Sequence, residues 1–146
     1  FCNTKVMCQR LSDDLRRAGI RADCLHGDIK QATREKTMAD FRHGKLPVLI
    51  ATDVASRGID VDDVDGVINY DVPEENEYYI HRIGRTGRAR KKGISFTLLG
   101  SFPEKAKLDE IAKFAGFHIV PMIFDEYGCL VPAPAEEKHP TSRRRF

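Results

Sequence analysis

The sequence of 146 residues has no tryptophan and only four cysteines, and no two of these cysteines form a C-x-x-C pair. This pattern argues against a structural zinc site and a disulfide scaffold, and it is typical of proteins from a reducing compartment. The sequence also has no apolar run long enough to span a bilayer and no secretory leader. We therefore expect a globular protein without membrane contact, in the cytoplasm or, in a eukaryote, also in the nucleus.

Both common phosphate-binding loops are missing as well. The sequence contains neither G-x-x-x-x-G-K-[ST] nor G-x-G-x-x-G, and no nucleophile is paired with a base. Asp125-Glu126-Tyr127-Gly128 lacks the setting of a metal site, so no metal ligands are predicted. If the chain contributes to a nucleotide site, it does so without a phosphate cradle.

The length suits one domain, and hydrophobic residues make up 41% of the chain. Phe1 opens the chain inside an apolar segment, which is expected of a piece of a longer protein. Residues 127–146 contain three prolines and end in an arginine run, so they are interpreted as a linker or tail after a domain of residues 1–126.

Charge is unevenly distributed although the net charge is only +2. Residues 60–77 carry acidic side chains and no lysine or arginine, whereas residues 81–92 carry basic side chains and no acid. A cationic block of this kind binds an anion or forms the solvated end of a helix.

Short apolar runs alternate with helical patterns along the chain. The runs predict a strand ending at Phe1-Cys2 and strands at 22–25, 48–51, 64–69, 94–99 and 119–124. The helical patterns cover 4–18, 31–42, 75–82 and 103–115. This alternation predicts an α/β fold with a mostly parallel sheet. The first helix is expected to be capped by Thr4 and to carry Val6, Met7, Leu11, Leu15 and Ala18 on one face.

Ligands of such sheets bind beyond the carboxyl ends of the strands, which directs attention to the loops. Residues 51–60 follow a buried strand, and the Thr52 hydroxyl with nearby backbone amides can meet a phosphate. Asp60 can accept hydrogen bonds from a ribose. The alternative is a short helix that Thr52 or Asp53 caps and Gly58 ends.

Residues 81–88 place three arginines at spacings of three, with Gly84 and Gly87 between them. The planar guanidinium suits phosphate oxygens, and two adjacent ones favour an anionic ligand. The alternative is an ordinary basic surface turn.

The third loop is His26-Gly27-Asp28, which opens a helix containing Gln31 and Arg34. Gly27 permits the close approach of a phosphodiester backbone, and Arg34 can contact it. The alternative is a packed His26, an N-cap at Asp28, and a pairing of Arg34 with Glu35 or Asp40.

Together these segments resemble the C-terminal RecA-like domain of the DEAD-box RNA helicases. Phe1-Cys2-Asn3-Thr4-Lys5 resembles motif IV, His26-Gly27-Asp28 the HGD element, residues 52–60 motif V, and residues 81–88 motif VI. Order and spacing agree over residues 1–124. DEAH-type and many DNA helicases have glutamine at the position of His81, and many family members have glycine at that of Arg90.

The resemblance implies a RecA-like three-layer αβα sandwich whose partner is an N-terminal RecA-like domain. ATP and Mg²⁺ would lie mainly on that domain, so this domain alone would be inactive, and the whole protein would unwind RNA duplexes or remodel RNPs. The roles it implies are arginine fingers for Arg85 and Arg88, ribose binding for Asp60, RNA-backbone binding for Thr4, Gly27, Arg34 and Thr52, and interdomain coupling for Asp53, Arg57, His81 and Arg82.

Two other functions remain open from the residues alone. One is a non-enzymatic RNA-binding module that uses this fold and the arginine-rich tail. The other is half of a DNA helicase, which His81 disfavours.

Overall fold

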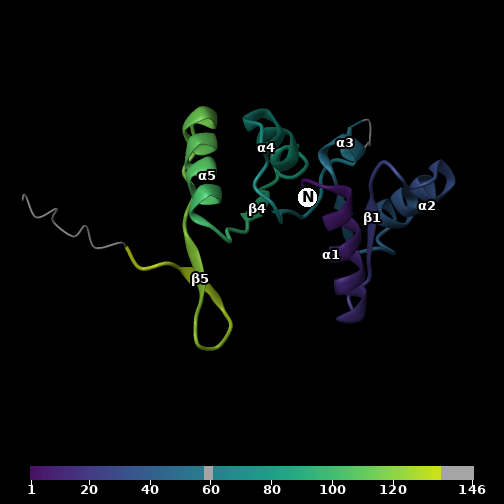
Figure 1. The fold of residues 1–146 in the computed structure, drawn as a ribbon, viewed down its shortest axis with the longest axis horizontal. Helices are drawn as coiled ribbons and strands as arrows, with labels where there is room; N and C mark the ends of the chain where they lie inside the picture. Colours follow the sequence, from purple (N-terminus) through teal and green to yellow (C-terminus); the bar gives the residue numbers. More distant parts are fainter. Residues whose placement is uncertain (58–60, 136–146) are drawn as a thin grey trace, which may run out of the picture. The chain divides into compact units, whose positions relative to one another are not determined.

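A computed structural model describes residues 1–57 and 61–135 of the chain. The described helices are α1 (Lys5–Arg17), α2 (Gln31–Arg42), α3 (Asp53–Ser56), α4 (Asn76–Ile83) and α5 (Phe102–Ala115) (Figure 1). The strands are β1 (Ala22–Leu25), β2 (Val48–Ala51), β3 (Gly66–Asn69), β4 (Ile94–Thr97), β5 (Met122–Phe124) and β6 (Leu130–Pro132). The chain divides into two compact units, with the boundary after Ala115.

The first unit contains two pairs of parallel strands. β1 pairs with β2 in the register Ala22 to Val48, and β3 pairs with β4 in the register Gly66 to Ile94. Parallel strands joined through helices are the pattern of an α/β fold, so the predicted fold class is confirmed.

The first two residues of the chain join these strand pairs. On one side, the Cys2 amide donates to the Ala51 carbonyl at 3.0 Å, and Cys2 forms a parallel bridge with Thr52. On the other side, the Tyr70 amide donates to the Phe1 carbonyl at 2.9 Å. The segments that follow β1, β2, β3 and Cys2 therefore emerge at one edge of the sheet.

Helix α1 begins at the predicted cap, because the Thr4 hydroxyl accepts a hydrogen bond from the Met7 amide at 3.2 Å. Met7, Leu11 and Leu15 pack against a core of Cys2, Cys8, Ala22, Cys24 and Ile50. Two members of the predicted apolar face, Val6 and Ala18, are exposed, whereas Cys8 and Ser12 are buried. Small side chains on the buried face let the helix lie close to the sheet, which hydrophobicity alone does not reveal.

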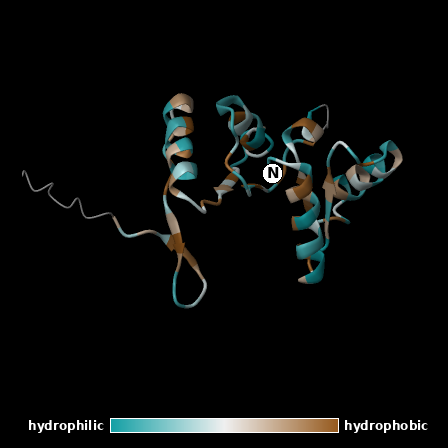
Figure 2. Cartoon of the chain, viewed as in Figure 1, coloured by the Kyte–Doolittle hydropathy of each residue, from teal (hydrophilic) through white to brown (hydrophobic). Residues whose placement is uncertain are grey.

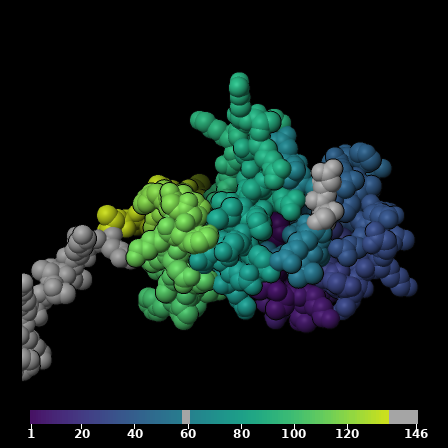
Figure 3. Space-filling model, turned by 90° about the horizontal axis from the view of Figure 1, so that it is seen from above, coloured from purple at the N-terminus to yellow at the C-terminus, as the bar shows by residue number. Residues whose placement is uncertain are grey.

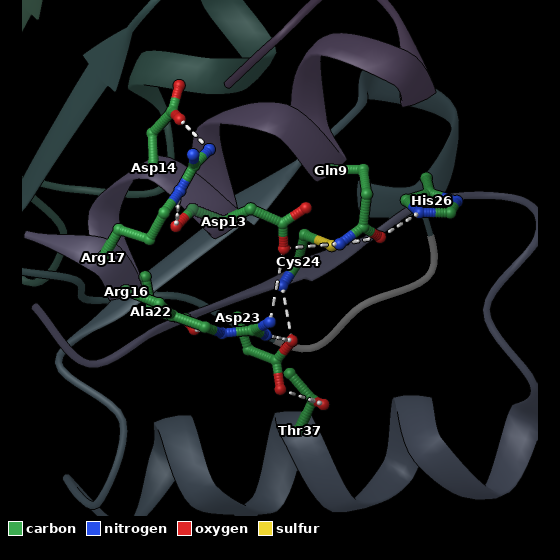
Figure 4. Close-up of polar contacts among 10 residues, drawn as sticks. All are labelled: Gln9, Asp13, Asp14, Arg16, Arg17, Ala22, Asp23, Cys24, His26 and Thr37. Carbon is green, nitrogen blue, oxygen red and sulfur yellow. Dashed lines mark hydrogen bonds and ion pairs between the residues drawn. The ribbon is translucent and has the colours of Figure 1, made fainter.

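Hydrogen bonds and an ion pair connect β1 to helices α1 and α2 (Figure 4). Arg16 donates to the Ala22 carbonyl at 2.8 Å and to the Asp23 carboxylate at 2.6 Å. The other Asp23 oxygen accepts from Thr37 on α2 at 3.4 Å. These contacts fix the strand that leads into the His26 loop.

The second unit contains an antiparallel hairpin of β5 and β6, with Ile123 opposite Val131. Its strands are among the hydrophobic, brown parts of Figure 2, and Phe124 is 72% exposed. Of the strand predicted at 119–124, only Met122–Phe124 forms a strand, which is β5. Strand β6 was missed because it lies in the proline-containing segment that was interpreted as a linker or tail. The predicted domain boundary at residue 126 stays a prediction.

The fold predicts how the four thiols react. Cys2, Cys8 and Cys24 are buried and Cys129 is exposed. Hydrogen bonds with Cys2 and Cys24, together with burial, raise the pKa of the Cys8 thiol, which keeps it protonated and unreactive. We expect dithionitrobenzoate to modify Cys129 at once and the other thiols only after denaturation, as measured by thionitrobenzoate absorbance. Fast modification that persists in a Cys129→Ser variant would contradict this packing.

Candidate functional site

The centre of the site is the buried side chain of Arg82 in α4, which is 1% exposed. Its Nε and Nη2 atoms donate to the two oxygens of Asp53 at 2.7 and 2.6 Å. Nη2 also donates to Asn3 Oδ1 at 2.8 Å, and Nη1 donates to the Asp71 carbonyl at 2.8 Å and to Asn69 Oδ1 at 3.4 Å. A guanidinium has five N–H groups, so these five bonds use them all.

A buried charge is costly unless it is paired and fully hydrogen-bonded, and Arg82 meets both conditions. Its partners come from three segments that follow neighbouring strands: Asn3 after Cys2, Asp53 after β2, and Asp71 after β3. The Phe1 ring lies 5.4 Å from the guanidinium carbon. Arg82 therefore holds the loops at this edge of the sheet in one arrangement.

A cleft of about 520 Å³ opens beside Arg82. Its lining includes all the residues that were predicted to act as arginine fingers or in interdomain coupling, namely Asp53, Arg57, His81, Arg82, Arg85 and Arg88. In Figure 3, the green-teal residues that follow α4 project from the surface of the first unit. The cleft carries more basic than acidic side chains, which favours an anionic ligand.

Arg85 and Arg88 meet at one carboxylate in this cleft. Arg88 Nη1 lies 2.8 Å from Asp62 Oδ2, and Arg85 Nη1 lies 3.6 Å from Asp62 Oδ1. Backbone carbonyls position both side chains further, since Arg88 Nε donates to Gly84 at 2.7 Å and Arg85 Nη2 to Ser56 at 3.4 Å. Two guanidinium groups thus converge on the place of a single anion.

The rest of the cleft wall is formed by Arg57 and His81. Arg57 Nη2 donates to the Tyr78 hydroxyl at 2.6 Å, and its guanidinium carbon lies 5.1 Å from the centre of the Tyr78 ring. His81 is exposed in the last turn of α4. Both side chains are accessible to a molecule on this face, whereas Arg82 is not.

The residues predicted to bind RNA lie on segments that contact one another. Thr4 and Thr52 follow Cys2 and β2, which are bridged, and the Lys5–Asp28 ion pair at 3.1 Å joins the start of α1 to the Gly27 loop. Arg34 donates to the Ala55 carbonyl at 3.1 Å, which joins α2 to α3. A Cβ atom at Gly27 would meet nothing in the described part of this chain within 4 Å, so space remains above the loop.

The structure also decides between the alternative roles of Thr52, His26 and Asp28. Thr52 caps α3, because its hydroxyl accepts from the Ala55 amide at 3.2 Å. His26 is a packed loop residue 3.3 Å from Gln9 Oε1. Asp28 is not an N-cap; it pairs with Lys5, and Lys30 occupies the cap position of α2. A cap and a ligand contact are compatible at Thr52, because a hydroxyl that accepts one bond can still donate another.

Sequence analysis missed two residues that organise the cleft, Asn3 and Asp62. Both lie in segments that were singled out, but their importance depends on which arginine the fold brings to them. Asp60, the predicted ribose ligand, lies outside the described residues.

The turn after Arg88 has the backbone conformation of glycine at two residues that are not glycine. Ala89 and Arg90 have φ angles of 53° and 67°, in the left-handed region that glycine adopts without cost. Arg90 thus occupies, under strain, a backbone conformation that favours glycine.

The parallel strands and the buried arginine at their carboxyl edge agree with a helicase C-terminal domain. The family model described as the helicase conserved C-terminal domain matches residues 1–90, and the chain belongs to this family. Within it, the chain is the C-terminal RecA-like domain of a DEAD-box helicase.

The relatives include ATP-dependent RNA helicase FAL1 of Saccharomyces cerevisiae, which is 50% identical over 84% of this chain and 30% of its own length. Probable ATP-dependent RNA helicase DDX17 of Mus musculus is 46% identical over 84% of this chain and 19% of its own length. The chain spans between 17% and 31% of these and the other curated relatives compared.

Solved structures agree with this assignment. A DEAD box protein from Methanococcus jannaschii superimposes with a TM-score of 0.75 at 46% identity, covering 81% of this chain and 32% of that one. The C-terminal domain of the DEAD-box protein Dbp5 superimposes with a TM-score of 0.74 at 38% identity, and the match covers 80% of this chain and 68% of that one.

In the described part of the chain, no helix has the length and apolar character needed to cross a membrane.

Two Asp→Asn substitutions at the site should differ greatly in their effect on the free energy of unfolding. Asp53→Asn leaves the buried Arg82 charge without its partner and should lower the free energy of unfolding by about 3–5 kcal/mol. Asp62→Asn breaks ion pairs that are exposed to solvent and should lower the free energy of unfolding by about 1 kcal/mol or less. Urea denaturation followed by circular dichroism measures both, and equal losses would contradict the central role of Arg82.

Proposed function

We propose that this chain supplies the arginine-bearing side of a composite ATP site in an ATP-dependent RNA helicase. The other side, with the phosphate cradle and Mg²⁺, belongs to an N-terminal RecA-like domain. The observation that carries the proposal is the convergence of Arg85 and Arg88 on one anionic position in the cleft. The curated relatives named above are ATP-dependent RNA helicases, which supports the same activity for the whole protein.

In this mechanism the two guanidinium groups act as arginine fingers. As the domains close, the γ-phosphate reaches Arg85 and Arg88 and replaces the carboxylate of Asp62. Charge that develops on the phosphoryl oxygens during hydrolysis is then stabilised by fixed donors. Arg57 and His81, exposed on the same wall, contact the closing domain, while Arg82 and Asp53 keep that wall rigid.

RNA binds at the neighbouring segments that carry Thr4, Gly27, Arg34 and Thr52. Hydroxyls, backbone amides and one guanidinium suit phosphate and sugar oxygens, so binding tolerates any sequence and weakens with salt. Helix α3 connects the two sites, because Thr52 caps it and Asp53, its first residue, holds Arg82. ATP and RNA therefore favour the same closed state and bind cooperatively, so that hydrolysis drives local unwinding or RNP remodelling.

Arg88→Ala in the full-length protein tests the catalytic part of this proposal. Loss of one finger should slow RNA-stimulated ATP hydrolysis by about 10³-fold or more, whereas the Kd for single-stranded RNA should change by less than about 2-fold. A coupled phosphate-release assay and fluorescence anisotropy measure the two quantities. Equal losses of hydrolysis and RNA affinity would show that Arg88 is an RNA contact.

Thr52→Ala tests the RNA-binding part, with Thr52→Ser as the matched variant that keeps the hydroxyl. We expect the alanine variant to bind unrelated single-stranded RNAs about 5- to 10-fold more weakly, because one charge-assisted hydrogen bond is lost. The serine variant should bind like the natural protein. An effect limited to one RNA sequence, or stimulation of hydrolysis by DNA as strong as by RNA, would overturn this assignment.

A further inference from the structure

The cleft contains one acidic side chain that the proposed function does not need for catalysis. Asp62 lies opposite both proposed fingers, with one carboxylate oxygen toward each guanidinium. The side chains of Arg85, Asp62 and Arg88 are 24%, 36% and 53% exposed, so a ligand can reach all three.

The backbone holds Asp62 in this position. The Val64 amide donates to the Arg85 carbonyl at 3.1 Å, and Val64 forms a parallel bridge with Thr86. The Thr86 hydroxyl also donates to the Val64 carbonyl. The segment carrying Asp62 is thereby fastened alongside the segment carrying both arginines.

A carboxylate and a terminal phosphate offer similar oxygens to a guanidinium, and both bind best in its plane. The same N–H groups cannot serve both anions at full strength. We propose that Asp62 competes with the terminal phosphate of the nucleotide for Arg85 and Arg88, and so lowers the affinity of the helicase for ATP. This inference rests on the proposed function, because it requires these arginines to bind the nucleotide.

The competition is weak enough for ATP to win. Ion pairs at this exposure are screened by water, and losing one changes an equilibrium constant by about 2- to 5-fold. The triphosphate, with more negative charge than one carboxylate, displaces Asp62 when the domains close. Asp62 therefore adjusts the nucleotide concentration needed for closure and does not block it.

The neighbouring Asp63 provides a matched control. Its carboxylate pairs with Lys91, which does not line the cleft. Its φ angle of 64° is one that asparagine tolerates, so Asp63→Asn removes the same charge from the same loop without backbone strain. Any difference between the two asparagine variants then reflects the arginines rather than net charge.

The test measures the Kd of a non-hydrolysable ATP analogue for the full-length protein with saturating single-stranded RNA. Asp62→Asn should bind the analogue about 2- to 5-fold more tightly than the natural protein, whereas Asp63→Asn and the charge-conserving Asp62→Glu should not. A purely structural disturbance would weaken binding, so the direction of the change is diagnostic. Raising NaCl from about 0.05 M to about 0.5 M should shrink the gain, because salt screens exposed charges.

Unchanged or weaker binding by Asp62→Asn, or an equal gain in Asp63→Asn, would overturn the inference. Hydrolysis of ATP by Arg88→Ala, measured in the coupled phosphate-release assay, separates this failure from failure of the proposed function. If Arg88→Ala hydrolyses ATP normally, the finger assignment itself is wrong. If it loses hydrolysis while the two asparagine variants behave alike, only the role of Asp62 is wrong.

Discussion

The structure depends on one buried ion pair, between Arg82 of α4 and Asp53 at the start of α3. A guanidinium that is 1% exposed is stable only because each of its N–H groups has an acceptor, and those acceptors come from distant parts of the chain. Asn3 and Arg82, for example, are 79 residues apart in sequence. The pair and its neighbouring hydrogen bonds thus join three separate segments into one rigid edge.

The short helix α3, at this rigid edge, contacts both the proposed RNA-binding segments and the arginines of the cleft. Thr52, just before it, caps the helix and is a proposed RNA contact, and Asp53 holds Arg82. Arg34 donates to the carbonyl of Ala55, and Arg85 to that of Ser56. A shift of α3 would therefore disturb the RNA-binding segments and the arginines of the cleft together, which is a direct physical route for coupling the two ligands.

Local patterns predicted much of the fold. The bounds of α2, β1 and β2 follow from apolar runs and from glycines just beyond the helix ends, and the cap at Thr4 follows from its hydroxyl. The predictions that failed depend on tertiary contacts. Val6 is exposed while Cys8 and Ser12 are the buried residues of α1, and β6 pairs with β5. Resemblance located the cleft residues, but only the fold reveals that Arg82 is buried and that Asp62 lies between the fingers.

The most direct test is a crystal structure of the full-length protein with single-stranded RNA and ADP–beryllium fluoride, which stands in for ATP. The account predicts that the guanidinium groups of Arg85 and Arg88 leave Asp62 and bind the fluoride atoms that represent the γ-phosphate. It also predicts that Arg82 keeps its hydrogen bonds to Asp53 and Asn3. A closed complex in which Arg85 and Arg88 remain on Asp62, or in which Arg82 leaves Asp53 to contact the nucleotide, would contradict it.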